Sequence, residues 1–353
     1  MAEGNTAAKK ESAGVGSAGK RWAFGLDIGG TTVKIGLFFL PAEGGQGSAS
    51  PAAWELAEHR AIRTRTSERN DDPGMPILGD AAAAMGEMLA ERSLDFSDVL
   101  GIGMGIPGAV IDQHTVNRCL NLGWGVVPAA EIMKRLTGVQ RVLAENDANA
   151  AAYGEMWRGA GAGFRSAVMV TIGTGIGSGI IWNDRIIAGS HSAAGEIGHM
   201  KMNRGADVSD ELEKMAAAPA ILAKVQGILE SGTAAEGYTD CLPTSLSAIP
   251  SAELTVKDIF DAAKEEDPLA CRIVRETGDI LGRALSYVSC VFDPEIFIIG
   301  GGVSQAGPIL LESVEQGFVP RAFHASRRTR FRLAQLGNDA GIWGAVRLVT
   351  EKK

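Results

Sequence analysis

The sequence predicts a mixed α/β protein in which one α/β unit occurs twice, with a cleft between the two copies. Three observations support this prediction. The chain has 353 residues, which is long for a single core and typical of two domains. A module of strand, glycine turn and strand occurs at 22–39, and the same plan returns at 166–189. Short apolar strands alternate with helical patterns in the rest of the chain, as they do in α/β proteins.

The first half of the chain contains the elements of one unit. The first twenty residues are small, polar and lysine-bearing, so we expect a disordered tail there and not a signal peptide. A strand is then expected at 22–27, before the glycine turn, and the following segments continue the unit. These are strands at 33–39 and 56–64, a helix at 77–92, a buried strand with a glycine loop at 99–111, a strand at 141–145, and a helix directly after it.

The second half repeats this plan and adds more helix. Its strands are expected within 166–189 and 295–304, and its helices at 210–230, 255–265, 268–291 and 340–350. The segment 228–250 contains Ser, Gly, Thr and Pro, which is typical of a surface excursion.

Composition and charge exclude several classes of protein. The formal net charge is −8 and the pI is about 5.3, so the chain offers no broad basic surface for nucleic acid. No segment has about 18 consecutive apolar residues, so we expect no membrane span. The cysteines include no C-x-x-C pair, which favours reduced thiols in a cytoplasmic protein over disulfides or a zinc site; they are Cys119, Cys241, Cys271 and Cys290.

Three glycine clusters follow apolar strands and are candidate phosphate-binding turns: Gly29–Gly30, Gly173–Gly177 and Gly300–Gly302. Glycine lets a ligand approach the main chain closely, and successive exposed N–H groups form a concavity that binds anions. One such cluster alone is usually a plain tight turn, but three at strand ends favour a phosphate ligand. The segment 103–108 also matches G-x-G-x-x-G, but no helix begins behind it, which argues against a nicotinamide-binding fold.

Asp27 lies in an apolar strand beside the first glycine turn. A buried carboxylate is costly unless it is paired or bound to a cation. A hydrated Mg²⁺ fits this position, because magnesium keeps several waters and takes one or two carboxylates. The alternative is that Asp27 accepts N–H groups from its own turn.

Two further groups of polar residues are candidates for binding a ligand. Asn146 and Asp147 lie where a strand meets a helix, so either can also be a plain helix cap. Glu196 and His199 are three residues apart and flanked by glycines, although a histidine of this kind is otherwise structural. Together these side chains can hydrogen-bond a polyhydroxylated ligand, because each sugar hydroxyl both donates and accepts.

With these motifs the sequence resembles the ROK family of sugar kinases and related repressors, within the actin-like (ribonuclease H-like) ATPase superfamily. The resemblance covers about Trp22 to Val349. It rests on the segments GLDIGGTTVKIGL, NLGWG, ENDANAAAYGE, TIGTGIGSGII, AAGEIGHM, IFIIGGGVS and LGNDAGIWGA. It implies a two-domain actin-like fold in which ATP and sugar meet between the domains. We expect a small α/β domain at 21–155, a larger one at 156–335, and a C-terminal helix at 336–353 that returns to the small domain.

The resemblance also implies roles for individual residues. Asp147 is the expected general base, which takes the proton of the sugar hydroxyl as it attacks the γ-phosphate of ATP. Asp27 is the expected Mg²⁺-associated acid. The expected sugar-binding residues are Asn121, Asn146, Asp147, Glu196, His199 and Glu213. The expected nucleotide-binding residues are Gly29, Gly30, Thr31, Thr32, Lys34, Thr174, Gly175, Gly177, Gly301 and Gly302.

The sequence departs from the family in one loop. Many members carry C-x-C-G-x-x-G-C-x-E after the G-E-x-G-H segment, and its cysteines join the histidine on a structural zinc. Here the segment from Gly198 to Met215 contains no cysteine, so we expect no zinc. The alignment of what remains makes Glu213 the sugar-binding glutamate. Some polyphosphate-using members also lack these cysteines, which leaves the phosphoryl donor open.

The leading hypothesis is an ATP-dependent hexose kinase that makes glucose 6-phosphate. The alternatives are a kinase for N-acetylmannosamine, fructose or allose, a polyphosphate-using glucokinase, and a sugar-sensing repressor. Repressors of this family carry a helix-turn-helix domain, and the 21 residues before Trp22 are too few to form one. The resemblance further implies a homodimer or higher homo-oligomer and closure of the two domains during catalysis.

Overall fold

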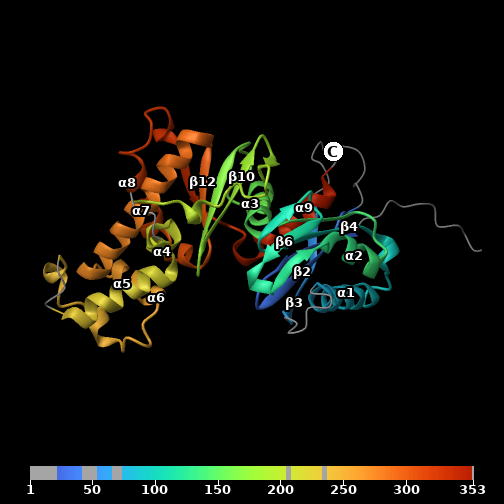
Figure 1. The fold of residues 1–353 in the computed structure, drawn as a ribbon, viewed down its shortest axis with the longest axis horizontal. Coiled ribbons are helices and arrows are strands. Elements are labelled where there is room, and N and C mark those ends of the chain that lie inside the picture. The colour runs from blue at the N-terminus through green and yellow to red at the C-terminus, as the bar shows by residue number, and fades with distance from the viewer. Residues whose placement is uncertain (1–21, 42–53, 66–73, 204–207, 233–236, 352–353) are drawn as a thin grey trace, which may run out of the picture.

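The chain forms two lobes, each built on a five-stranded sheet, which meet along a central pair of helices (Figure 1). The computed structural model describes residues 22–41, 54–65, 74–203, 208–232 and 237–351. The small lobe contains the first sheet and lies on the right in Figure 1, and the large lobe contains the second sheet and lies on the left. The predicted tail at 1–20 lies outside the described residues.

The sheet of the small lobe has the strand order β3-β2-β1-β4-β8. The first three strands form an antiparallel meander, and β4 and β8 then add in parallel. The register places Asp27 of β1 opposite Lys34 of β2. The strands are β1 Trp22–Ile28, β2 Thr32–Phe39, β3 Glu55–Arg63, β4 Val99–Ile106 and β8 Val142–Asn146.

Helices cover both faces of this sheet. α1 (Met75–Ala90) and α2 (Ala129–Thr137) bury their apolar faces against one side and form the main core of the lobe. α9 (Ala340–Thr350), from the far end of the sequence, packs on β1 and β4. Glycine makes this approach possible, since a Cβ on Gly103 would lie 1.7 Å from the carbonyl oxygen of Ala345.

A second, three-stranded sheet extends the small lobe toward the cleft. Its order is β5-β6-β7, with both pairs antiparallel. Its strands are β5 Ala109–Ile111, β6 Thr115–Cys119 and β7 Trp124–Val127.

The sheet of the large lobe repeats the plan of the first, with the order β11-β10-β9-β12-β13. Again three strands form an antiparallel meander and two more add in parallel. These strands are β9 Ala167–Ile172, β10 Ile176–Trp182, β11 Arg185–Ile186, β12 Ile296–Gly300 and β13 Arg330–Leu333. The helices of the lobe share one large apolar core with the sheet: α4 Leu212–Ala216, α5 Ala218–Ser231, α6 Val256–Lys264, α7 Pro268–Phe292 and α8 Pro308–Phe318.

The central pair of helices consists of α3 (Asp147–Arg158) and α9. Their backbones touch, because a Cβ on Gly344 would lie 1.6 Å from the carbonyl oxygen of Ala150, and one on Gly154 would lie 2.2 Å from that of Ala340. α3 also lies directly against β10 of the large lobe, with Gly179 as the point of close approach. Each lobe therefore holds one helix of the pair tightly.

The structure differs from the sequence-based elements in a few places. The helix expected at 210–230 is two helices, because Pro219 disfavours helix before it and Ala217 has extended backbone. The expectation also lacked α2, α8, the sheet β5-β6-β7 and strand β13. All four cysteines are free in the structure. Within the described residues, every helix is too short or too polar to cross a membrane.

Candidate active site

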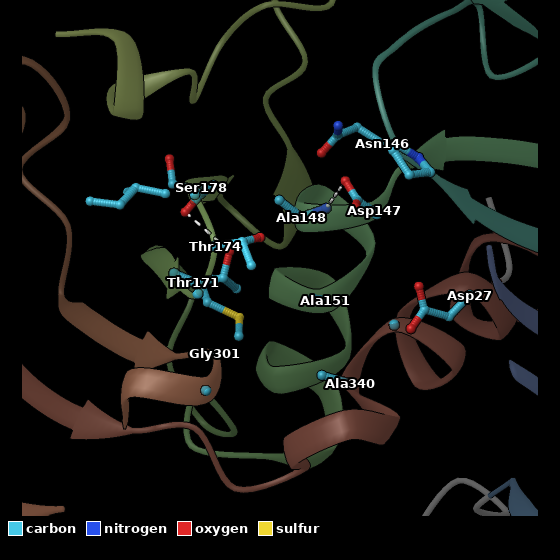
Figure 2. Close-up of a pocket in the computed structure, with 18 of the residues that line it drawn as sticks. Asp27, Asn146, Asp147, Ala148, Ala151, Thr171, Thr174, Ser178, Gly301 and Ala340 are labelled. Carbon is cyan, nitrogen blue, oxygen red and sulfur yellow. Dashed lines mark hydrogen bonds between the residues drawn. The ribbon is translucent and has the colours of Figure 1, made fainter. Parts of the chain in front are cut away.

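A cleft of about 880 Å³ lies between the two lobes and gathers most of the residues that the sequence singled out. The small lobe contributes Asp27, Lys34, Asn121, Asn146 and Asp147. The large lobe contributes Thr174, Gly175, Gly177, Glu196, His199, Glu213, Gly301 and Gly302. Figure 2 shows this arrangement, with Asp147 at the end of α3 between Thr174 and Asp27.

Asp147 is the first residue of α3 and extends into the cleft. Its Oδ1 accepts a hydrogen bond from the backbone N–H of Ala148 at 2.9 Å (Figure 2). Burial raises the pKa of Asp147 to about 6, and the nearby carboxylates of Asp27 and Glu196 act in the same direction. A carboxylate whose pKa is close to neutral is suited to accept a proton and release it again.

Asn146 is the N-cap of α3. Its side-chain oxygen accepts from the N–H of Asn149 at 3.1 Å, and its amide donates to the carbonyl of Gly108 at 3.1 Å. The capping alternative is therefore confirmed for Asn146, while its contact with sugar stays a prediction. Behind it, the buried carboxylate of Glu145 accepts from the N–H of Asn146 and from the amide of Asn149. This network fixes the start of α3 and with it the position of Asp147.

Asp27 lies in the cleft beside the start of α9, where it is paired with Lys34. The Lys34 Nζ is 3.0 Å from Asp27 Oδ2 and donates a second bond to the Asn338 carbonyl at 3.0 Å. Gly341 allows this approach, since a Cβ there would lie 2.8 Å from Asp27 Cγ. The Asp27 side chain is 21% exposed and lines the cleft, so its carboxylate can still face a hydrated cation.

The carboxylate of Glu213 holds the second glycine turn, Gly173–Gly177, in place. Glu213 Oε2 accepts from the N–H of Ile176 at 3.1 Å, and the side chain also accepts from Lys214. Burial raises the pKa of Glu213, but these hydrogen bonds outweigh burial and hold it below its usual range. A Cβ on Gly175 would meet the same carboxylate at 2.3 Å. Glu213 therefore supports the turn directly, which its predicted role as a sugar ligand did not include.

Glu196 and His199 line the same side of the cleft. His199 Nδ1 is 3.5 Å from Glu211 Oε2, and its Nε2 is 4.0 Å from Glu196 Oε2. The residue before Glu196 is held in place, because the hydroxyl of Ser178 donates to the Gly195 carbonyl. His199 is 64% exposed and lines the cleft, so its imidazole is accessible to a ligand there, and its role stays a prediction.

The first glycine turn does not line the cleft as the second and third glycine clusters do. Gly29, Gly30, Thr31 and Thr32 are absent from the lining of the cleft in the part of the chain that the structure describes. The turn lies beside Asn121, since a Cβ on Gly30 would be 3.3 Å from the Asn121 carbonyl. Its contact with phosphate stays a prediction.

Several residues of the cleft were missed by sequence reasoning. They are Arg118, Cys119, Ser178, Ser304, Gln305 and Asn338. Cys119 lines the cleft, and burial raises the pKa of its thiol, which disfavours the reactive thiolate. Ser304 and Gln305 lie two and three residues after the third glycine cluster, and that position was the available signal for them.

The side chains of the cleft bear on the expected magnesium and on the expected absence of zinc. Among the described residues, no three His, Cys, Asp or Glu side chains come together to hold a metal ion. This arrangement fits a magnesium ion that takes one carboxylate, that of Asp27, and completes its shell with water and phosphate. The expected absence of zinc stays a prediction, because residues 204–207 of the loop lie outside the described residues.

Comparison with known proteins places the chain in a family. The model of the ROK family matches residues 23–352. The glucokinase of Halalkalibacterium halodurans is 34% identical over 94% of this chain and 96% of its own length. The N-acetyl-D-glucosamine kinase of Histophilus somni is 24% identical over 92% of this chain and 98% of its own.

A solved structure agrees with these sequence matches. The ROK family glucokinase from Streptomyces griseus, in complex with glucose and AMPPNP, superposes with a TM-score of 0.69 and is 28% identical. The match covers 93% of this chain and 98% of that one. The expected actin-like ATPase fold is thereby confirmed. The chain belongs to the ROK family.

Proposed function

We propose that this protein transfers the γ-phosphoryl group of ATP to a hydroxyl of a hexose, and that the hexose is glucose. It is a sugar kinase, as its glucokinase relatives support. The observation that carries the proposal is the position of Asp147. Its carboxylate, with a pKa of about 6, lies in a cleft that also contains glycine turns and the paired Asp27 and Lys34.

From its position in the cleft we infer one task for Asp147. Phosphoryl transfer needs the acceptor hydroxyl in line with the γ-phosphate, and charge stabilisation around it. Asp147 accepts the hydroxyl proton on Oδ1 or Oδ2 as the sugar oxygen attacks phosphorus and the bond to ADP breaks. Because α3 begins at Asp147 and is fixed by the Asn146 cap, the base is held rigidly.

The donor side of the reaction is assigned to main-chain groups and a few charges. The turn Gly173–Gly177, which includes Thr174, lines the cleft, and its main-chain N–H groups and the Thr174 hydroxyl suit the terminal phosphates. Asp27 would hold Mg²⁺ through its waters, and bound magnesium neutralises developing phosphate charge. Gly301 and Gly302, at the end of β12, would lie toward the nucleoside.

The sugar is assigned to the part of the cleft at the N-terminal end of α3. Asn121, Asn146 and Asp147 approach it from the small lobe, and Glu196, His199 and Glu213 from the large lobe. Hydroxyls that donate to a carboxylate and accept from an amide or imidazole are bound selectively, because a missing hydroxyl leaves a polar group unpaired.

The substitution Asp147→Asn tests the assignment of the base. We expect kcat to fall by about 10²- to 10⁴-fold. Glucose binding, measured by calorimetry, should persist within about threefold, since the amide can still hydrogen-bond a hydroxyl. Asp258→Asn is the matched control, because Asp258 is also in the first turn of a helix but lies in α6, outside the cleft. A kcat for Asp147→Asn within about tenfold of the parent would exclude Asp147 as the base.

A substrate panel tests the rest of the proposal. We expect the highest kcat/KM with glucose and ATP, compared with N-acetylglucosamine, N-acetylmannosamine, fructose and allose, and with polyphosphate as donor. A higher kcat/KM with an N-acetylated hexose would contradict glucose as the substrate while keeping the kinase chemistry. A preference for polyphosphate would contradict ATP as the donor.

A further inference from the structure

The chain passes between its two sheets twice, and one buried side chain contacts both connections. The first connection, 159–166, leads from α3 to β9, and the second, 334–339, leads from β13 back to α9. Glu155, in the last turn of α3, is 0% exposed and lies between them.

The carboxylate of Glu155 accepts three backbone hydrogen bonds. Oε1 accepts from the N–H of Gln335 at 2.9 Å and of Leu336 at 2.7 Å, both in the second connection. Oε2 accepts from the N–H of Ala160 at 2.8 Å, in the first connection. Three amides from two connections thus converge on one carboxylate.

Two glycines next to Glu155 leave room for these contacts. The neighbouring Gly154 is a contact point between α3 and α9, with room for a hydrogen only. On the other side, a Cβ on Gly159 would lie 1.9 Å from Glu155 Oε2. Glycine at 159 is therefore required for the carboxylate to reach the amide of Ala160.

We propose that Glu155 is the pivot residue of lobe closure, a positioning residue that ties both connections to the helix carrying Asp147. This inference rests on the proposed function, because closure has a catalytic purpose only if sugar and nucleotide meet in the cleft. Asp147 is at one end of α3 and Glu155 is near the other. When the lobes rotate about Glu155, the hydrogen bonds of Glu155 keep α3 in a fixed position relative to both connections. The distance between Asp147 and the glycine turn at Gly173–Gly177 therefore stays the same.

The chemistry of a carboxylate explains why glutamate suits this position. An ionised carboxylate is an acceptor at both oxygens, so it can serve three N–H donors at once. Glutamine has nearly the same shape, but its amide group is a donor. In Glu155→Gln the amide nitrogen faces either the N–H of Ala160 or the two N–H groups of Gln335 and Leu336, and the N–H groups that it faces lose their acceptor.

The first measurement is the coupling between the two substrates. Calorimetry gives the dissociation constant of a non-hydrolysable ATP analogue with and without saturating glucose. In the parent protein we expect glucose to lower the dissociation constant of the analogue by about tenfold, which is within the usual range for coupled sites. In Glu155→Gln we expect this factor to fall by about fivefold or more, while glucose binding alone changes by less than about twofold.

Kinetics and scattering provide two further readouts. We expect kcat of Glu155→Gln to fall more than the KM for glucose changes, since the pivot acts on alignment and not on sugar contacts. The decrease in radius of gyration that glucose produces in the parent, measured by small-angle scattering, should be smaller in the variant.

Asp267→Asn is the matched control for a buried carboxylate that binds backbone N–H groups. Asp267 accepts from the N–H of Ala270 and of Ser245, and it caps α7 far from both connections. It should lower thermal stability without changing the coupling factor. A similar loss of coupling in Asp267→Asn would show that general destabilisation is the cause, and would overturn the inference.

A second variant perturbs the same contact without changing Glu155. In Gly159→Ala the new methyl displaces Oε2 from Ala160, so the coupling factor should also fall. Gly227→Ala, in α5, is its control, because a Cβ there meets no atom within 4 Å. If Glu155→Gln does not fold, Gly159→Ala decides the question.

The outcomes separate the two proposals. A parent protein that phosphorylates no hexose overturns the proposed function and this inference with it. An active parent whose folded Glu155→Gln or Gly159→Ala variant keeps full coupling and closure overturns the pivot alone.

Discussion

Lys34 neutralises Asp27 from the neighbouring strand and at the same time holds the segment that leads into α9. Its Nζ lies 3.0 Å from Asp27 Oδ2 and 3.0 Å from the carbonyl oxygen of Asn338. The charge at Asp27 in turn raises the pKa of Asp147. The pair therefore links the expected magnesium acid, the expected base and the start of α9 through one ammonium group.

Asp27→Asn should have two effects, a lower apparent affinity for Mg²⁺ and a lower pKa of Asp147. We expect the Mg²⁺ concentration for half-maximal rate to rise about tenfold, because Mg²⁺ prefers an anionic carboxylate to a neutral amide. The acid limb of kcat/KM should move to lower pH, since one of the charges that raise the pKa of Asp147 is removed.

Lys34→Met is the complementary variant for this prediction. It leaves the carboxylate of Asp27 without its cation, so the acid limb should move to higher pH. If the acid limb of kcat/KM shifted equally and in the same direction in both variants, a coupling between Asp27 and Asp147 would be contradicted.

The rate should depend on pH through Asp147. Its pKa is raised to about 6, first by burial and then by Asp27 and Glu196. The base works only when ionised, so kcat/KM should fall about tenfold per pH unit below that value. The measurement is a profile of kcat/KM from pH 4.5 to 8 with a coupled assay. A rate that stays constant down to about pH 4.5 would place the essential base elsewhere.

The stability of the fold should change with pH in the opposite direction to the rate. A carboxyl with a raised folded-state pKa favours unfolding when ionised, so its penalty is complete above about pH 6 and disappears as the pH falls to 3.8. Asp147→Asn should therefore stabilise the fold at pH 8, by at most about 3 kcal/mol, and have little effect below about pH 4. Urea unfolding at the two pH values measures this difference. Stabilisation of equal size at both would contradict a raised pKa.

The loop after His199 should hold its shape without metal. Backbone bonds join Met202 to Asp210 at 2.8 Å and Leu212 to Met200 at 2.9 Å, and Lys201 is 3.1 Å from Glu211. We expect dialysis against a strong chelator to leave the melting temperature unchanged within about 1 °C, whereas structural zinc contributes directly to folding energy. Elemental analysis should find less than about 0.1 zinc per chain. A chelator-dependent loss of stability would contradict the expectation of no zinc.

The sequence predicted the parts of the site that depend on local pattern. Asp147 at a junction of strand and helix, and Gly173–Gly177 between two strands, are short-range features, and the structure places both in the cleft. The repeated strand plan was also visible, because apolar runs and glycine turns recur in the chain.

The remaining parts depend on tertiary contacts and could not be predicted. Glu155 reads as an ordinary helical residue until the fold brings Gln335 and Leu336 to it from 180 positions away and more. Glu213 was aligned as a sugar ligand, but only the fold reveals that its carboxylate supports Ile176. The strands β5 to β7 are short and partly exposed, so their periodicity is too weak to predict a sheet.

Ser192 makes a contact between the lobes, near the part of the cleft that we propose binds sugar. Its hydroxyl donates to the carbonyl of Val110 in β5 at 2.6 Å, across the gap between the segment before Glu196 and the small lobe. Such a hydrogen bond contributes about 0.5–1.5 kcal/mol, so Ser192→Ala should raise the KM for glucose by about two- to tenfold and leave the KM for ATP nearly unchanged.

The control for this variant is Ser231→Ala, which removes a similar hydroxyl bond, to the carbonyl of Gly227 at 2.8 Å within α5. Scattering without sugar should show a larger radius of gyration for Ser192→Ala than for this control, because the open state gains population when the bond is lost. Identical radii together with an unchanged KM for glucose would mean that the lobes keep their arrangement without Ser192. Closure would then depend on the sugar contacts and on the α3 and α9 pair alone.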